Sequence, residues 1–269
     1  MAMGPWHGER LAAPSHISDQ FAGGTHNVTV LRRLLPDTVS VDEVHGDDAD
    51  VLYPQEAAHI ARAVPKRQRE FATVRKCARR ALQRFDIERH PMVPGTAGAP
   101  AWPSGIVGSM THCDEYRAAA VARAGDIEAV GIDAEPAQEL PPGVLRTVAS
   151  AAEIDSLTRL RHVIPGVAWD RLLFSAKESI YKVWYPLSHD WLGFEEADVE
   201  LFPAGSFRAE LARPLPSTLT SAGVRELWGR WGSDGCHVMT CVVLPTHLFT
   251  RRPLLKIPET PLHRSLGTQ

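Results

Sequence analysis

The chain of 269 residues is long enough for one large domain, or for two small ones, with a buried core. Its 44% hydrophobic and 23% charged residues are typical of a globular protein and argue against disorder of the whole chain. The formal net charge of −3 predicts no general nucleic-acid surface, so any anion site must be local.

The cysteines and the apolar segments narrow the class of protein further. None of the four cysteines forms a C-x-x-C pair, which argues against a zinc ribbon or a thioredoxin-like site, and a disulfide framework is not expected at this length. The first 20 residues contain no apolar segment of signal-peptide type, and no stretch reaches 18 uninterrupted apolar residues. We therefore expect no membrane span, a cytoplasmic location, a loose arm at residues 1–20 and a flexible tail at residues 251–269.

The first helical region is predicted at residues 55–63, and a second helix begins at Pro65 and reaches residue 85. The buried face of the second helix is marked by apolar residues at spacings of three and four: Phe71, Val74, Ala78 and Leu82. Its basic residues fall largely off that face and predict a solvated basic surface: Lys66, Arg67, Arg69, Arg75, Lys76, Arg79 and Arg80. The acidic run at residues 45–50 lacks EF-hand spacing and predicts a solvated loop.

A Gly/Pro-rich loop at residues 91–105 separates this helix from a series of strands. The first strands are predicted at residues 106–111, 118–122 and 127–135, with short turns that favour antiparallel pairing. Helices at 149–160 and 169–184 follow, the second ended by Pro186. The last strands are predicted at residues 198–202, 207–211, 224–231 and 237–244. This order predicts an α+β fold, with two similar halves that meet near residues 135–145.

Asp133 and Glu135 are the sharpest local feature, in the sequence GIDAEP at the end of a predicted strand. Side chains two residues apart on a strand share a face, and two carboxylates so close repel unless a cation lies between them. Oxygen ligands of this kind suit Mg²⁺. The alternative is a solvated strand end with two unrelated acids, because D-x-E is a common sequence.

A second candidate lies on the predicted helix 169–184, in the sequence FSAKESIYK. Glu178 and Lys182 are four residues apart and share a helix face, which by itself describes an ordinary surface ion pair. Together with the D-x-E strand, Glu178 could instead be a third carboxylate on one metal ion. Lys177 and Lys182 would then add positive charge for a phosphate.

A third candidate, GSMTHC, closes the strand after the Gly/Pro-rich loop. Ser109, Thr111 and His112 can donate hydrogen bonds to phosphate oxygens, and the histidine could also accept a proton from an alcohol. The alternative is a turn with a packed histidine. The sequence contains neither a P-loop nor a Rossmann glycine motif.

These motifs stand in an order that resembles a known family, the 4′-phosphopantetheinyl transferases of the surfactin- and enterobactin-synthetase activating type. The likeness is greatest to their actinobacterial branch, which includes the mycobacterial type II enzyme, and covers about residues 30–245. The matching segments are APAWP at 99–103, GSMTHC at 108–113, VGIDAEP at 130–136 and FSAKESIYK at 174–182, with flanking matches within 66–79 and at 191–195.

The resemblance implies a fold and an activity. Such enzymes move the phosphopantetheine arm of coenzyme A onto a serine of an acyl or peptidyl carrier domain and release adenosine 3′,5′-bisphosphate. The implied fold is a pseudo-twofold pair of α+β halves in one chain, here residues 21–140 and 141–250, with the active site between them. The implied cofactor is Mg²⁺, with Mn²⁺ as a substitute, and the expected state is a monomer that binds neither nucleic acid nor membrane.

The resemblance also implies roles for individual residues. The metal ligands would be Asp133, Glu135 and Glu178. The coenzyme A contacts would be Arg67, Arg75, Gly95, Thr96, Ser109, Thr111, His112, Asp133, Lys177, Glu178 and Lys182. Glu178, directly or through a metal-bound water, is the first candidate for the base that accepts the serine proton, and His112 is the second. Lys182, with Lys177, would add positive charge at the pyrophosphate.

One departure from the family pattern concerns residues 94–100. Close relatives carry lysines in this loop, and this chain has none, so that no side-chain charge from the loop could reach the 3′-phosphate. Lys66, Arg69 or His90 are the candidates to replace them. A different Mg²⁺-dependent phosphohydrolase and a non-catalytic coenzyme A or nucleotide-binding module remain the alternative functions.

Overall fold

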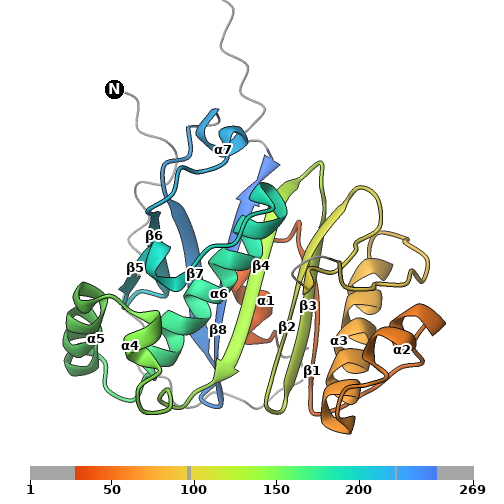
Figure 1. Ribbon diagram of the computed structural model, residues 1–269, viewed down its shortest axis with the longest axis horizontal. Coiled ribbons are helices and arrows are strands. Elements are labelled where there is room, and N and C mark those ends of the chain that lie inside the picture. The colour runs from red at the N-terminus through yellow and green to blue at the C-terminus, as the bar shows by residue number, and fades with distance from the viewer. Residues whose placement is uncertain (1–27, 96–97, 222, 247–269) are drawn as a thin grey trace, which may run out of the picture.

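Two antiparallel sheets stand side by side in the computed structural model, and a long helix packs on each (Figure 1). The structure describes residues 28–95, 98–221 and 223–246, so the predicted arm at 1–20 and tail at 251–269 lie outside it. The helices are α1 (Val30–Leu34), α2 (Pro54–Ile60), α3 (Pro65–Gln83), α4 (Leu145–Val148), α5 (Ala151–Val163), α6 (Trp169–Ser188), the 3₁₀ turn η2 (Phe194–Glu196) and α7 (Ser217–Ser221). The strands are β1 (Ser40–His45), β2 (Ile106–Cys113), β3 (Tyr116–Arg123), β4 (Ile127–Pro136), β5 (Ala197–Phe202), β6 (Ser206–Leu211), β7 (Leu227–Ser233) and β8 (His237–Pro245). The α+β class is confirmed.

The smaller sheet has the order β1-β3-β2 and is covered by α3 (Figure 1). Pro65 occupies the first turn of α3, where its missing N–H costs nothing. The predicted apolar face is buried, and Ala78 and Leu82 belong to the same core cluster as Ala119 and Val121 of β3. The alanines of β3 let the helix lie close to the sheet.

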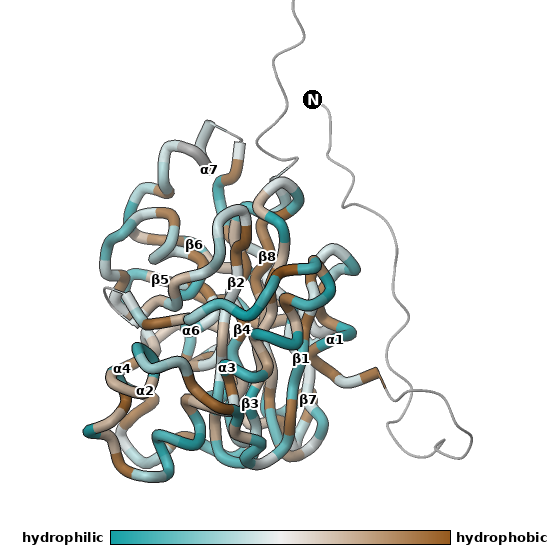
Figure 2. Tube along the Cα trace, turned by 90° about the vertical axis from the view of Figure 1, so that its right-hand side faces the viewer, coloured by the Kyte–Doolittle hydropathy of each residue, from teal (hydrophilic) through white to brown (hydrophobic). Residues whose placement is uncertain are grey.

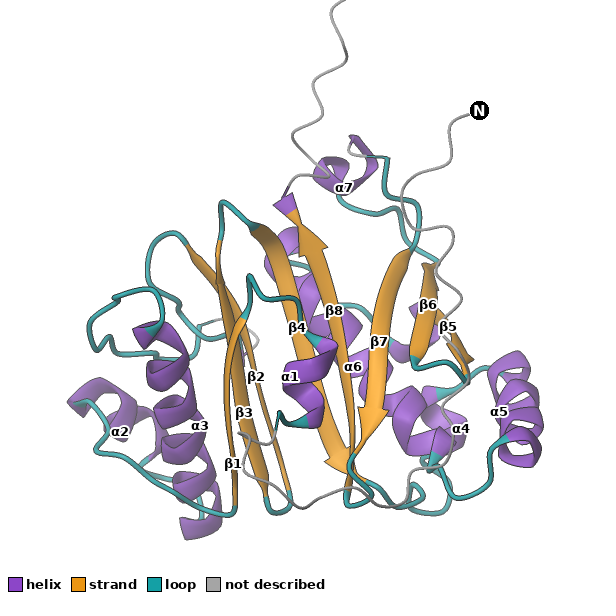
Figure 3. Ribbon diagram, turned by 180° about the vertical axis from the view of Figure 1, so that it is seen from behind, coloured by secondary structure: helices purple, strands orange, loops and turns teal. Residues whose placement is uncertain are grey.

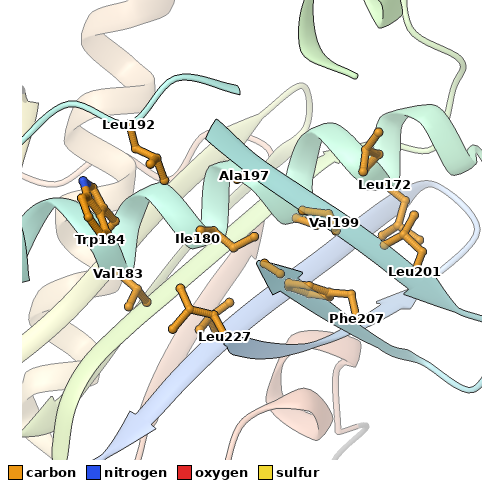
Figure 4. Packing of buried hydrophobic residues seen from close by; sticks show 14 of the residues in the cluster. Leu172, Ile180, Val183, Trp184, Leu192, Ala197, Val199, Leu201, Phe207 and Leu227 are labelled. Carbon is orange, nitrogen blue, oxygen red and sulfur yellow. The ribbon is translucent and has the colours of Figure 1, made fainter. Parts of the chain in front are cut away.

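The larger sheet has the order β4-β8-β7-β6-β5. Helix α6 lies across one face of it, and α1 contacts β7 and β8 on the other face (Figures 1 and 3). Ile180 and Val183 of α6 share one core cluster with Val199, Phe207 and Leu227 of the strands (Figure 4). The peripheral loops are largely hydrophilic (Figure 2). Within the described residues, no helix combines the length and the apolar character that a membrane span requires.

The short turn between β3 and β4 does not produce the predicted antiparallel pair. β2 and β3 pair as expected, but both edges of β3 are already occupied by β1 and β2, so β4 crosses to the larger sheet and pairs with β8. The two sheets are instead joined by hydroxyl groups of β2. The Oγ of Ser109 accepts from the Ile132 amide of β4 at 3.1 Å, and the Oγ1 of Thr111 accepts from the Ala134 amide at 3.1 Å.

Helix α6 does not end before Pro186, as the sequence predicted, but continues to Ser188. Pro186 removes only one amide donor, the one that would bond the Lys182 carbonyl, and the helix continues for only two more residues. His189 ends the helix in a left-handed conformation and donates its amide proton to the Tyr185 carbonyl at 2.8 Å. Gly131 permits the close contact of α6 with β4, because a Cβ there would lie 2.0 Å from the Ser179 carbonyl oxygen.

The predicted solvated basic face of α3 and the predicted solvated loop at 45–50 contact each other. Asp47 bonds both Arg69 and Arg117 at 2.8 Å, and Asp48 bonds Lys76 at 2.5 Å. The predictions that both segments are simply solvated are therefore wrong in part. A sequence pattern indicates whether each segment is exposed, but it does not show that the acidic loop and the basic helix face pair with each other.

Candidate active site

Asp133 lies at the junction of the two sheets, with 4% of its surface exposed. Its Oδ1 accepts hydrogen bonds from Lys182 of α6 at 2.7 Å and from the Thr111 hydroxyl of β2 at 3.1 Å. Lys182 also donates to the Ile132 carbonyl at 3.0 Å. The other carboxylate oxygen, Oδ2, is buried and has no hydrogen-bond partner in the described part of the chain.

Glu135 follows two residues later on β4 and faces Arg171 of α6, whose guanidinium lies 3.2 Å from Oε2. Burial and then the negative charge of Asp133 raise the pKa of Glu135 to about 7, although Arg171 opposes that shift. The sequence analysis missed Arg171. Helical periodicity could have found it, because residues 171, 178 and 182 recur on one face of α6.

Glu178 belongs to the same electrostatic cluster. Its pKa is raised by burial, lowered in part by Lys182 and raised again by Asp133. Lys182 pairs with Asp133 and not, as the i, i+4 spacing predicted, with Glu178. The Asp133 charge thus acts on both glutamates, which come from a strand and a helix more than 40 residues apart in sequence.

The carboxylates fit a hard cation by two observations. Asp133 Oδ2 is a buried acceptor with no donor, and the pKa of Glu135 is raised in part by a like charge that a divalent ion would neutralise. In the described residues, however, no three His, Cys, Asp or Glu side chains already stand together as a ligand group, and Glu135 and Asp133 are instead paired with Arg171 and Lys182. The metal-ligand roles of Asp133, Glu135 and Glu178 stay predictions.

His112 is the second-last residue of β2 and lies beside Arg67 in the first turn of α3. Its Nε2 is in close contact with the Arg67 guanidinium, and its Nδ1 lies 3.6 Å from Glu70 Oε2. Burial, and then the charges of Arg67, Lys182 and Arg117, lower the pKa of His112 to about 4, so the imidazole is neutral at physiological pH. Arg67 and His112, both predicted to contact coenzyme A, are therefore brought together, and Glu70 is an acidic neighbour that sequence analysis missed.

Arg75 is buried, in contrast to the predicted solvated surface. Its Nε donates to the Met92 carbonyl at 2.9 Å, its guanidinium stacks on Phe71, and Glu56 of α2 lies 3.8 Å away. Burial lowers the pKa of Arg75 to about 9. Glu56 also contacts the buried Arg79 and accepts from the Met92 amide at 2.8 Å. The predicted role of Arg75 at the nucleotide phosphates stays a prediction, and its observed contact is with the start of the 91–105 loop.

The 91–105 loop is present as predicted. Gly95 donates to the Ala99 carbonyl at 2.8 Å, Pro94 and Pro100 form an isolated bridge, and Thr96 lies outside the described residues. The Trp102 ring packs on Gly108, where a Cβ would lie 2.7 Å from the indole.

Lys66 and Arg69, proposed above as replacements for the missing lysines, are paired with aspartates. Lys66 bonds Asp114 at 3.0 Å and Arg69 bonds Asp47 at 2.8 Å. Both cations are well exposed, and exposed pairs contribute little to stability, so either cation could exchange its partner for a phosphate.

Lys177 is separated from the carboxylate cluster. Its buried ammonium group donates to Glu153 of α5 and to the Phe194 carbonyl, both at 2.9 Å. Glu153 also accepts from the amides of Ser150 and Val199. These contacts describe a structural ion pair, and the predicted role of Lys177 near the pyrophosphate stays a prediction.

A cavity of about 140 Å³ opens beside Glu178. It is lined mainly by apolar and aromatic side chains. The rings of Tyr181 and Trp191 contact each other, with their centroids 5.1 Å apart. Trp191 is 68% exposed, which is unusual for so large an apolar side chain. A carboxylate at the rim of an apolar cavity can bind a largely uncharged chain and act on a polar group at its end.

A larger hollow of about 350 Å³ lies at the C-terminal end of α6, between Trp184 and the segment before α7. Its one cation, Arg213, is bound to the Trp191 carbonyl at 2.6 Å and lies 3.3 Å from Asp190. Because the lining holds no member of the carboxylate cluster, we assign the chemistry to the cluster and not to this larger hollow.

Comparison with known proteins agrees with these features. Residues 55–122 match the family model of the 4′-phosphopantetheinyl transferase N-terminal domain, and residues 129–233 match that of the 4′-phosphopantetheinyl transferase superfamily. The chain is 51% identical over 202 residues to 4′-phosphopantetheinyl transferase Svp of Streptomyces mobaraensis, and the aligned region covers 74% of this chain and 80% of Svp. It is 42% identical over 225 residues to 4′-phosphopantetheinyl transferase PptT of Mycobacterium tuberculosis, and the aligned region covers 80% of this chain and 98% of PptT. By these sequence matches, this chain belongs to the 4′-phosphopantetheinyl transferases.

Proposed function

We propose that this enzyme transfers the 4′-phosphopantetheine group of coenzyme A to a serine of an acyl or peptidyl carrier domain, with release of adenosine 3′,5′-bisphosphate, in a Mg²⁺-dependent reaction. The observation that carries the proposal is the cluster of Asp133, Glu135 and Glu178 beside Lys182 and Arg67–His112, within a chain of this family. Carboxylates beside cationic groups are suited to hold a metal ion and a diphosphate together.

The proposed metal ligands are Asp133, Glu135 and Glu178, and Mn²⁺ is the expected substitute. When bound, the divalent ion would neutralise charge on the pyrophosphate and orient the phosphoryl group. Lys182, already held by Asp133 and the Ile132 carbonyl, supplies a fixed positive charge at the same place. Arg67, beside His112 and partly exposed, is placed to hold a nucleotide phosphate.

Glu178 is the proposed base. In the reaction, the serine oxygen bonds to the phosphorus that carries the pantetheine, the bond from that phosphorus to the bridging oxygen breaks, and the serine proton passes to the Glu178 carboxylate. In the protein without metal, burial raises the pKa of Glu178, which is the direction that a proton acceptor needs. His112 is the weaker candidate, because its pKa is lowered to about 4 and its Nε2 is engaged by Arg67.

The apolar cavity beside Glu178 is the proposed place of the pantetheine arm. Tyr181, Leu192 and Phe194 offer apolar contacts to an uncharged chain, and the exposed Trp191 at the margin offers a contact to a carrier domain. The carrier itself, drawn from fatty-acid, polyketide or nonribosomal peptide synthesis, is a proposal, as are the monomeric state and the cytoplasmic location.

A modification assay tests the proposal. A purified apo-carrier, incubated with the enzyme, coenzyme A and Mg²⁺, should gain about 340 Da, the mass of the transferred group, and the gain should stop when a chelator is added. Several carriers of each type should be tried in parallel. Hydrolysis of coenzyme A with every carrier left unmodified would favour a phosphohydrolase, and binding without either reaction would favour a non-catalytic module.

A further inference from the structure

The hydroxyl group of Thr111 joins two strands and a carboxylate. It accepts a hydrogen bond from the Ala134 amide and lies 3.1 Å from Asp133 Oδ1. An amide N–H can only donate, so the single proton of the hydroxyl remains free for the carboxylate. The direction of both hydrogen bonds is therefore fixed by the amide of β4.

Asp133 is held unevenly as a result. Oδ1 receives two donors, the Thr111 hydroxyl and the Lys182 ammonium, whereas the equally buried Oδ2 receives none in the described part of the chain. Two donors on one oxygen restrict rotation of the carboxylate and leave the other oxygen as an oriented acceptor. Supporting hydrogen bonds of this kind orient ligands around metal ions.

We infer that Thr111 is a positioning residue, which fixes Asp133 so that Oδ2 is presented to the divalent ion. The inference rests on the proposed function, since it concerns the metal site of that reaction. This role differs from the coenzyme A contact that the resemblance implied for Thr111, because its hydroxyl has one proton and donates it to Asp133.

Ser109 provides a matched control within the same strand. It lies two residues before Thr111, is equally buried, and its Oγ accepts from the Ile132 amide at the same 3.1 Å. Its hydroxyl forms a bond of the same kind between β2 and β4, and its hydrogen bonds in the structure include none to a carboxylate. Removal of either hydroxyl leaves one amide of β4 without its hydrogen-bond acceptor. Only removal of the Thr111 hydroxyl also takes a hydrogen bond away from the Asp133 carboxylate.

The test is direct binding of Mn²⁺, followed by electron paramagnetic resonance in the absence of coenzyme A, because Ser109 is itself among the predicted coenzyme A contacts. We expect Thr111→Val, which keeps the shape and removes the hydroxyl, to weaken Mn²⁺ binding by roughly 10- to 100-fold. Thr111→Ser should retain the affinity of the parent protein, and so should Ser109→Ala. Thermal unfolding without metal should show similar losses of stability for Thr111→Val and Ser109→Ala, because each leaves one buried amide unpaired.

The outcomes separate this inference from the proposed function. Unchanged Mn²⁺ affinity in Thr111→Val, an equal loss in Ser109→Ala, or no Mn²⁺ binding by the parent protein would each overturn the inference, even if the parent protein modifies carriers. Selective loss in Thr111→Val alone, with rescue by Thr111→Ser, would support it, even if no carrier were modified and the proposed function failed.

Discussion

The two long helices bury different kinds of surface. Helix α6 buries an apolar face and one ion pair, Lys177–Glu153, while its Glu178 and Lys182 lie near Asp133 of β4. Helix α3 buries Arg75 and Arg79 as well as its apolar residues, and both arginines depend on Glu56 of α2.

This difference predicts that substitutions of the charged residues on α6 near Asp133 and of the buried arginines on α3 have different effects. On α6, Glu178 and Lys182 lie outside the apolar core cluster, so their replacement should affect the reaction more than the fold, unlike that of the buried Lys177. Around α3, buried charges hold α2, α3 and the 91–105 loop together, and removal of one partner leaves an uncompensated charge in the interior.

The largest expected effect tests the α6 side of the comparison. Glu178→Gln should lower the rate of carrier modification by roughly 10²- to 10⁴-fold, because it removes the proposed proton acceptor. Thermal stability should be unchanged or higher, because burial disfavours the charged form of Glu178. The measurement is carrier mass against time, beside thermal unfolding of the same sample. Full turnover in this variant would remove Glu178 from the role of base.

The next effect tests the α3 side. Glu56→Ala should destabilise the protein by about 3–5 kcal/mol, because Arg79 and Arg75 lose their buried counter-charge. Denaturant unfolding measures it. Arg80→Ala, which changes a half-exposed neighbour on the same helix, is the control and should have little effect. Equal stability of the two variants would contradict a structural role for the buried charges.

A smaller effect, on the pH dependence of stability, is expected from the titration of Glu135. In the folded protein Glu135 keeps its proton up to about pH 7, whereas the unfolded chain releases it near 4.5, so the folded state binds more protons between these values. Without metal, stability should therefore fall as pH rises through this window, by at most about 3 kcal/mol. Thermal unfolding with a chelator measures the fall. Glu135→Gln should flatten the profile, and a profile unaltered by that substitution would locate the titration elsewhere.

The smallest effect is expected where a charge is both exposed and paired. Lys66→Ala breaks the surface bond to Asp114 and should leave thermal stability unchanged. The same variant tests the replacement of the missing loop lysines, because it should weaken coenzyme A binding in calorimetry and reduce the salt dependence of that binding. Lys76→Ala, on the same helix but bound to Asp48, is the matched control.

Local patterns predicted most of the elements. The spacing of Phe71, Val74, Ala78 and Leu82 identified the buried face of α3, since period-3.6 packing needs only the sequence of one helix. Strand β1 escaped notice because its sequence, SVDEVH, places two acids in its centre and hides the alternation. The pairing of β4 with β8 could not be predicted, because it joins segments about 100 residues apart.

The candidate site was predictable to the same depth. Spacing marked the D-x-E strand and the KES helix as candidates, and the resemblance to the family supplied their roles. Helical geometry could have separated the two lysines. Lys177 and Lys182 are five residues apart, a rotation of about 140°, so both cannot face one carboxylate cluster. The contact of Thr111 with Asp133 crosses between two sheets, and no periodicity within either strand contains that information.

The position of β4 has a consequence for how the enzyme is made. Its backbone is bordered by β8, the last strand of the described chain, so the carboxylates of β4 cannot take their places until β8 has been made and has left the ribosome. A nascent chain that ends before His237 would hold Asp133 and Glu135 on an unfinished edge. Activity should consequently arise late and all at once during synthesis, and two fragments cut between β3 and β4 should regain it only by reassociating.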